Sequence, residues 1–131
     1  MLLVLDASVA VAASHTPLGF ASFAGHELVA PQLMRIETAS VLHEMAWRGE
    51  LGTDRARTML TRVLEAAVEI RQPAGLVEVA WQVADELGWA KTYDAEYVAL
   101  AQLLKCRLVT LDERLIRGVG RLGIAIRPRE L

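Results

Sequence analysis

The chain has 131 residues, of which 53% are hydrophobic and 23% charged, so it suits one domain over residues 1–131 and excludes a disordered polymer. Its net charge of −2 argues against nucleic-acid binding by bulk attraction, although seven of the ten charged residues from Lys105 to Leu131 are basic. No apolar run approaches the roughly 20 residues of a membrane span. With no cationic leader and a single cysteine, Cys106, which we expect to be a small core residue, the sequence favours the reducing cytoplasm.

The apolar residues predict short buried strands that alternate with helices. In chain order the expected elements are a strand at 2–5, a helix at 9–13, a loop or short helix at 17–25, a strand at 28–30, a helix at 32–48, a helix at 53–66, a strand at 68–70, a helix at 76–87, a helix at 94–104, a strand at 107–111, a helix at 113–119 and a strand at 124–126. Ser8 is placed to cap the first helix. This alternation predicts an α/β fold of three layers, α/β/α, with a central, mostly parallel sheet of about five short strands.

Glu37 is the most informative acidic residue. On the helix at 32–48, its neighbours one turn away include Met34 and Val41, so we expect its carboxylate to face the interior or its edge. An ionised acid is costly there unless a cation or hydrogen-bond donors compensate its charge. Glu44 is a contrast on the same helix, because Arg48 four residues later offers it an ordinary exposed ion pair.

Three aspartates, Asp6, Asp94 and Asp112, lie where a buried element ends or a helix begins. For each of them, a structural role as a helix N-cap is an open alternative to a functional one. Sites in parallel sheets lie beyond the carboxyl ends of the strands, where Asp6 and Asp112 are expected. Together with Glu37 these acids can converge on one pocket, where some are protonated or a cation sits among them.

The donor types favour Mg²⁺ or Mn²⁺, because the four acids offer hard oxygen ligands, whereas His15, His26 and His43 lack metal-ligand spacing. A carboxylate-bound Mg²⁺ suits phosphate chemistry above all. Other nucleotide chemistries are disfavoured. No Gly-rich phosphate loop is present, and Ser8 stands where an aspartyl-phosphate phosphatase needs a second aspartate.

Four segments carry a family resemblance that spans essentially the whole chain. They are Val4-Leu5-Asp6-Ala7-Ser8, then Ala30-Pro31-Gln32-Leu33 leading to Glu37, then Thr92-Tyr93-Asp94-Ala95-Glu96-Tyr97-Val98-Ala99-Leu100-Ala101, and Thr110-Leu111-Asp112-Glu113-Arg114-Leu115. In this order and spacing the sequence resembles the PIN-domain nucleases, specifically the VapC-type toxins of toxin–antitoxin pairs. The third segment is the most specific of the four.

The resemblance implies a PIN-like fold and an endoribonuclease whose acidic quartet, Asp6, Glu37, Asp94 and Asp112, holds Mg²⁺ or Mn²⁺. It further implies that a water activated by the metal attacks an RNA phosphodiester in line, leaving a 5′-phosphate and a 3′-hydroxyl. Ser8 and Thr110 match hydroxyl positions near the quartet and are expected to fix carboxylate rotamers, unless they are only local caps. The family also implies a homodimer and a cognate VapB-type antitoxin that blocks the site.

Several further residues have two interpretations. Arg114, Arg117 and Arg121 follow Asp112 at helical spacing, so that one helix face either contacts RNA phosphates or is merely solvated. The chain has a mean hydropathy of +0.31, which suggests more apolar surface than a lone monomer needs. Its three tryptophans either line a protein interface or pack in the core; they are Trp47, Trp81 and Trp89. Glu113 is the nearest candidate for a second metal site.

Two other functions remain open on the sequence alone. A non-catalytic interaction module would keep the fold without needing four mutually repelling acids. A nuclease directed at DNA or at structured nucleic acid would use the same metal site.

Overall fold

Five parallel strands form one central sheet in the computed structural model, which describes residues 1–131. The strand order is β3-β2-β1-β4-β5, and the strands are β1 Leu2–Leu5, β2 Glu27–Ala30, β3 Val68–Ile70, β4 Arg107–Val109 and β5 Ala125–Ile126. β1 lies at the centre, where Val4 pairs with Val29 of β2 on one side and with Leu108 of β4 on the other. The predicted parallel sheet of about five strands is therefore confirmed.

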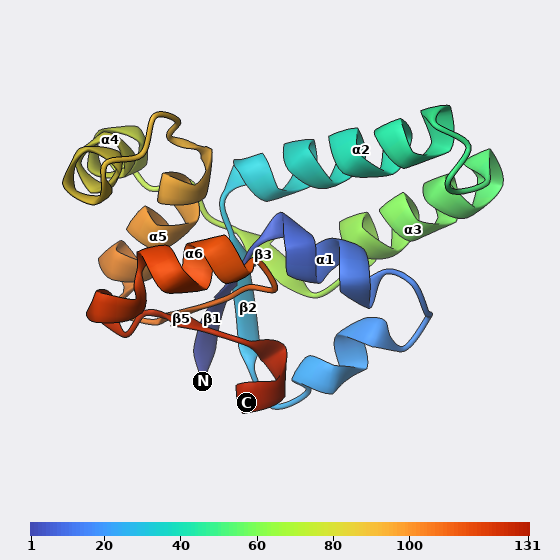
Figure 1. Ribbon diagram of the computed structural model, residues 1–131. Helices are drawn as coiled ribbons and strands as arrows, with labels where there is room; N and C mark the ends of the chain where they lie inside the picture. The colour runs from blue at the N-terminus through green and yellow to red at the C-terminus, as the bar shows by residue number, and fades with distance from the viewer.

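Helices cover both faces of this sheet. They are α1 Ala7–Ala13, α2 Gln32–Trp47, α3 Thr53–Glu65, α4 Leu76–Leu87, α5 Tyr93–Leu104 and α6 Glu113–Gly118, with 3₁₀ turns η1 Gly19–Phe23, η2 Gly120–Leu122 and η3 Pro128–Glu130. Figure 1 shows α1, α2 and α3 grouped on one side of the strands, and α4 with α5 on the other. This separation follows from the strand order, because right-handed crossovers that reverse direction after β3 place the later helices on the opposite face.

The reversal also positions the site. β1 and β4 are neighbours in the sheet although more than 100 residues separate them in sequence. Their carboxyl ends therefore bring Asp6 and the segment after Val109 together at the point where the strand order changes direction. Ligand sites of open parallel sheets lie at such points.

The apolar residues of β1 lie in the centre of the core. Leu3, Val4 and Leu5 are all fully buried, as expected of a central strand covered on both faces. Cys106 was predicted to be a small core residue. In the structure it is half-buried and packs against the core. None of the helices combines the length and the apolar character that crossing a membrane requires.

Three of the differences from the predicted element boundaries affect residues of the site. Helix α1 begins at Ala7 rather than at residue 9 and is capped by Asp6, not by Ser8, because the Asp6 carboxylate accepts a hydrogen bond from the Val9 N–H. Helix α5 begins at Tyr93, which places Asp94 inside the first turn and not at the N-cap. The fourth strand ends at Val109 instead of residue 111, since Thr110 and the residue after it turn toward the site.

The tryptophans divide between surface and core. Trp47 at the end of α2 is 80% exposed and Trp81 on α4 is 65% exposed, so core packing is the wrong interpretation for both. Trp89 is partly buried and packs against the core. Val41, expected on the inner side of α2, is 39% exposed.

Candidate active site

Asp6 is the most buried acid of the chain, with only 5% of its surface exposed. Both of its oxygens accept hydrogen bonds. Oδ1 accepts from Ser8 Oγ at 2.6 Å and from the Val9 N–H at 3.1 Å, and Oδ2 accepts from Thr110 Oγ1 at 2.5 Å. The carboxylate therefore has a fixed orientation at the end of β1, where it also caps α1.

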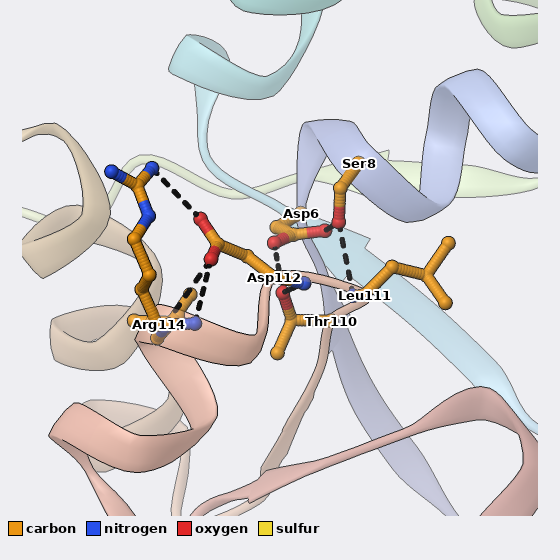
Figure 2. Close-up of polar contacts among 7 residues, drawn as sticks. Asp6, Ser8, Thr110, Leu111, Asp112 and Arg114 are labelled. Carbon is orange, nitrogen blue, oxygen red and sulfur yellow. Dashed lines mark hydrogen bonds and ion pairs between the residues drawn. The ribbon is translucent and has the colours of Figure 1, made fainter.

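Two hydroxyls connect the ends of β1 and β4, as Figure 2 shows. Ser8 Oγ donates to Asp6 and accepts from the Leu111 N–H at 3.0 Å. Thr110 Oγ1 donates to Asp6 and accepts from the Asp112 N–H at 3.0 Å. Each hydroxyl thus joins the Asp6 carboxylate to the backbone after β4, so Ser8 and Thr110 serve Asp6 rather than a helix end.

Glu37 is half-buried on α2 and is held by a residue from the opposite face of the sheet. The phenol oxygen of Tyr97 on α5 donates a hydrogen bond of 2.6 Å to Glu37 Oε1. Tyr97 itself is only 1% exposed, so packing fixes its ring. Because the donor is rigid, one oxygen of Glu37 is oriented and the other remains free to bind a ligand.

Asp94 and Asp112 complete the acidic group. Asp94 lies in the first turn of α5, and its side chain is exposed and accepts no hydrogen bond. The N-cap alternative is therefore wrong for Asp94. Asp112 does cap α6, with Oδ1 accepting from the Arg114 N–H at 2.9 Å, while Oδ2 lies 3.5 Å from the Arg114 guanidinium.

The four acids line a single cavity of about 380 Å³, which we call the carboxylate cavity. They reach it from four parts of the chain: the end of β1, helix α2, helix α5 and the start of α6. The one basic residue in its lining is Arg114, whose side chain is 83% exposed. The cavity thus collects negative charge without a buried positive partner.

The electrostatics of the acids agree with this description. Burial raises the pKa of Asp6, against the opposing effect of its Ser8 and Thr110 hydrogen bonds. Loss of water contact also raises the pKa of Glu37, which the Tyr97 hydrogen bond counteracts and the charges of Asp94 and Asp6 reinforce. The pKa of Asp94 is raised by desolvation and then by the charge of Asp112. Several acids in one cavity therefore hold their charge less readily than free carboxyl groups do.

The donor set fits Mg²⁺ or Mn²⁺. No three or more His, Cys, Asp or Glu side chains are arranged as ligands around a common point, so this geometry does not offer a cage made only of protein groups. Mg²⁺ does not need one, because it commonly binds one or two carboxylates and keeps several waters. Burial and mutual repulsion disfavour the ionised forms of Asp6, Glu37 and Asp94 and raise their pKa values, and a bound cation would favour these ionised forms.

The basic residues after Asp112 do not share one helix face. Helix α6 ends at Gly118, so Arg121 lies in the separate turn η2, and the predicted single face holds only Arg114 and Arg117. All three side chains are exposed. Of the three, Arg114 is the one that lines the carboxylate cavity.

Glu113 does not line the carboxylate cavity. The guanidinium of Arg127 contacts both of its oxygens, at 2.8 and 2.7 Å, and these hydrogen bonds lower the pKa of Glu113. Glu113 is therefore wrong as a candidate for a second metal site. The ion pair of Glu44 with Arg48 is an exposed one, as predicted.

Tyr97 is the site residue that sequence reasoning missed. It lies three positions after Asp94, on the same face of α5, within a segment that carries the family resemblance. That spacing was a usable signal, but an aromatic residue in an apolar helix is more often part of the core. Only the contact with Glu37, 60 residues away in sequence, separates the two roles.

The chain is therefore a parallel α/β protein with a carboxylate cavity at the switch point of its sheet, where ligand sites of such folds lie. Comparison with known proteins gives the family. The model of the PIN domain family matches residues 3–121, and the chain therefore belongs to the PIN-domain family.

The curated relatives are of the VapC type. The chain is 37% identical to VapC ribonuclease Mb0985 of Mycobacterium bovis over 98% of its own length and all of that protein. It is 36% identical to ribonuclease VapC3 of Pyrobaculum aerophilum, over 88% of this chain and 92% of that one. The crystal structure of PAE2754 from Pyrobaculum aerophilum superposes with a TM-score of 0.80 at 25% identity, covering 99% of this chain and 94% of that one.

Proposed function

We propose that this protein is a Mg²⁺- or Mn²⁺-dependent endoribonuclease and the toxin of a VapBC-type toxin–antitoxin pair. The observation that carries the proposal is the carboxylate cavity, whose lining holds four acids from separate parts of the chain and no buried counter-charge. The relatives that match nearly the whole chain are named as VapC ribonucleases, which supports RNA as the substrate.

The roles of the side chains follow from their contacts. Among Asp6, Glu37, Asp94 and Asp112, one or two carboxylates would bind the cation directly and the others through its waters. The bound cation would neutralise the phosphodiester charge and activate a water molecule. Ser8 and Thr110 keep the Asp6 carboxylate in one orientation, and Tyr97 does the same for Glu37. Arg114, exposed at the rim, is placed to meet an RNA phosphate.

The proposal also includes an antitoxin partner and a second copy of the chain. A VapB-type antitoxin is expected because the relatives are VapC proteins, and it would act by covering the carboxylate cavity. A homodimer and a cytoplasmic location are also proposed. The exposed Trp47 and Trp81 support an interface, because tryptophan is enriched at protein interfaces.

Asp94→Asn gives the sharpest test. Asp94 caps no helix and accepts no hydrogen bond, so the amide removes charge from the cavity with little structural consequence. Asp85→Asn on α4 is the matched control, an exposed aspartate outside the cavity. With total RNA and Mg²⁺, we expect the wild type and Asp85→Asn to cleave equally and Asp94→Asn to lose about 100-fold or more in rate, as removal of a charge-stabilising group typically does.

Equal cleavage by Asp94→Asn and the wild type would contradict the proposal, since a contaminating nuclease would explain both. No cleavage by the wild type, with Mn²⁺ also supplied, would instead favour the non-catalytic interaction module. Inhibition by single-stranded DNA that is itself cleaved would indicate a nuclease directed at DNA.

A further inference from the structure

A second cavity of about 500 Å³ adjoins the carboxylate cavity. The two share Glu37, Asp94 and Arg114 in their linings, so they form one continuous depression. The second one extends under the segment that joins α4 to α5, at residues 88–92, and we call it the α4–α5 cavity. Its volume is in the range of pockets that hold small molecules, about 300–1,000 Å³.

Three further lining residues give this cavity its chemistry: Trp89, Lys91 and Tyr93. Tyr93 is 54% exposed, and neither its hydroxyl nor the Lys91 ammonium has a hydrogen bond or ion pair within the chain. A flat aromatic face and two cations, Lys91 and Arg114, are therefore available to a ligand. Aromatic faces with nearby cations are the groups that bind single-stranded nucleic acid.

Trp89 forms a fixed wall of the cavity. Its indole lies so close to Gly118 of α6 that a Cβ on this glycine would be 2.8 Å from the Trp89 Cζ2. The absence of a side chain at residue 118 thus lets the ring settle against α6, and the same ring packs on the core. Tyr93 by contrast has a free face and can stack on a ligand.

We propose that the α4–α5 cavity binds the nucleotide next to the scissile phosphodiester, with its base stacked on Tyr93 and its phosphate held by Lys91 and Arg114. The inference rests on the proposed ribonuclease function and adds a subsite to it. Continuity with the carboxylate cavity selects this occupant, because a strand whose phosphodiester lies at the acids must continue past Arg114. The subsite thereby decides which base is preferred beside the cut.

The test uses the full-length chain with a fluorescein-labelled ten-nucleotide RNA of mixed sequence and with Ca²⁺ in place of Mg²⁺, so that the strand stays intact. Fluorescence anisotropy should show that Tyr93→Ala weakens RNA binding about 10-fold, while Tyr93→Phe, which keeps the ring, binds as the wild type does. Lys91→Gln should weaken binding and flatten its dependence on salt by about 0.7 on the double-logarithmic scale, the contribution of one phosphate contact to a single strand. Lys105→Gln is the control, since this lysine lies at the other end of α5.

Cleavage of the same RNA pool with Mg²⁺ then measures preference. Tyr93→Ala should raise KM, keep kcat within about two-fold, and lose base preference at the position beside the cut, because stacking acts on ground-state binding. Wild-type affinity and wild-type preference in Tyr93→Ala would overturn the subsite while leaving the ribonuclease function intact. A changed sedimentation mass without a change in RNA affinity would overturn it too, by showing that the cavity is covered by a second copy of the chain. Because binding is measured apart from cleavage, an inactive wild type that binds RNA through Tyr93 would contradict the proposed function alone.

Discussion

Glu37 depends on a side chain from another helix for its orientation. It lies on a helix whose buried residues, Met34, Thr38 and Leu42, carry no charge, and its one hydrogen-bond partner is the Tyr97 phenol. Burial and the Glu37 carboxylate both raise the pKa of Tyr97, so the phenol is protonated at neutral pH and acts as a donor. A neutral, rigid donor can orient the Glu37 carboxylate without neutralising its negative charge.

Tyr97→Phe tests this role, because it removes the hydroxyl and leaves the ring in the core. We expect the affinity for Mn²⁺ and kcat to fall by about 10- to 100-fold, the usual effect of losing a group that orients a metal ligand. KM for RNA should change little. Calorimetry and steady-state kinetics measure these effects.

Thr38→Val is the control for Tyr97→Phe. It also deletes a fully buried hydroxyl, on the residue after Glu37, but that hydroxyl contacts Met34 and not the cavity. Both variants should lose about 1 kcal/mol of unfolding free energy. Equal Mn²⁺ affinity in the two variants would show that Tyr97 is only a core residue.

At the scale of single residues, sequence reasoning succeeded where a residue conflicts with its surroundings. Glu37 stood out because an acid among apolar neighbours needs a reason, and the structure places it in the cavity. The roles of Ser8 and Thr110 were harder, because a hydroxyl near a helix start reads equally well as a cap. Their shared partner is Asp6, which is two residues from Ser8 but 104 residues from Thr110, at the end of the neighbouring strand. A pair so distant in sequence leaves no local signal.

At the level of the elements, a single residue, Asp6, joins strand β1 to the short helix α1. Asp6 ends β1, caps α1 and lines the carboxylate cavity, so its capping role and its role in the cavity are not alternatives. Asp112 repeats this arrangement between β4 and α6. Because the caps fix where each helix begins, they also fix where each carboxylate points.

Two substitutions of Asp6 separate the stability that comes from its role as an N-cap from the effect of its negative charge. Asparagine is as good an N-cap as aspartate and carries no charge, whereas alanine provides no cap. In EDTA we expect Asp6→Asn to unfold at the same or higher urea concentration than the wild type, because it removes a buried charge whose pKa is raised. Asp6→Ala should lose about 0.5–2 kcal/mol, the usual worth of an N-cap.

Urea unfolding followed by circular dichroism measures this order. Both variants should be inactive toward RNA, since both lack the carboxylate. An Asp6→Asn protein that is markedly less stable than the wild type, and as unstable as Asp6→Ala, would show that the negative charge itself stabilises the fold, and the cavity would then need no cation to compensate it.

Element boundaries were predictable where a residue physically ends the element. Gly88, in the left-handed conformation with φ of 71°, ends α4 at the predicted residue because most side chains are strained there. The extent of α6 was not predictable in the same way. Arg114, Arg117 and Arg121 keep helical spacing, but Gly118 and Gly120 end the regular helix before the third arginine.

Across the whole molecule, the order of the strands matters more than any one motif. The reversal of direction after β3 places β1 beside β4 and so gathers Asp6, Asp94 and Asp112 at one edge. Strand alternation predicted the layers and the parallel sheet. The order in which strands pair depends on contacts between distant segments, so the family resemblance, and not the local pattern, pointed to the acids meeting.

The cavity also links stability to pH. A carboxyl group whose folded pKa is raised favours folding below its unfolded pKa of about 4, and this contribution is lost as the pH rises through the folded value. Asp6, Glu37 and Asp94 all have this sign. Glu113 has the opposite sign, since Arg127 lowers its pKa, so comparison with a cavity variant is needed to isolate the three acids.

A divalent cation is proposed to compensate the charge of the carboxylate cavity, and the measurement that tests this is the unfolding free energy against pH, in EDTA and in excess Mn²⁺. In EDTA the wild type should lose stability relative to Asp94→Asn as the pH rises from about 4 to neutrality. Mn²⁺ at 100 times its dissociation constant should return about 2.7 kcal/mol to the wild type at neutral pH, and much less to Asp94→Asn or at acid pH. A wild type whose stability neither falls relative to Asp94→Asn nor responds to Mn²⁺ would contradict the claim.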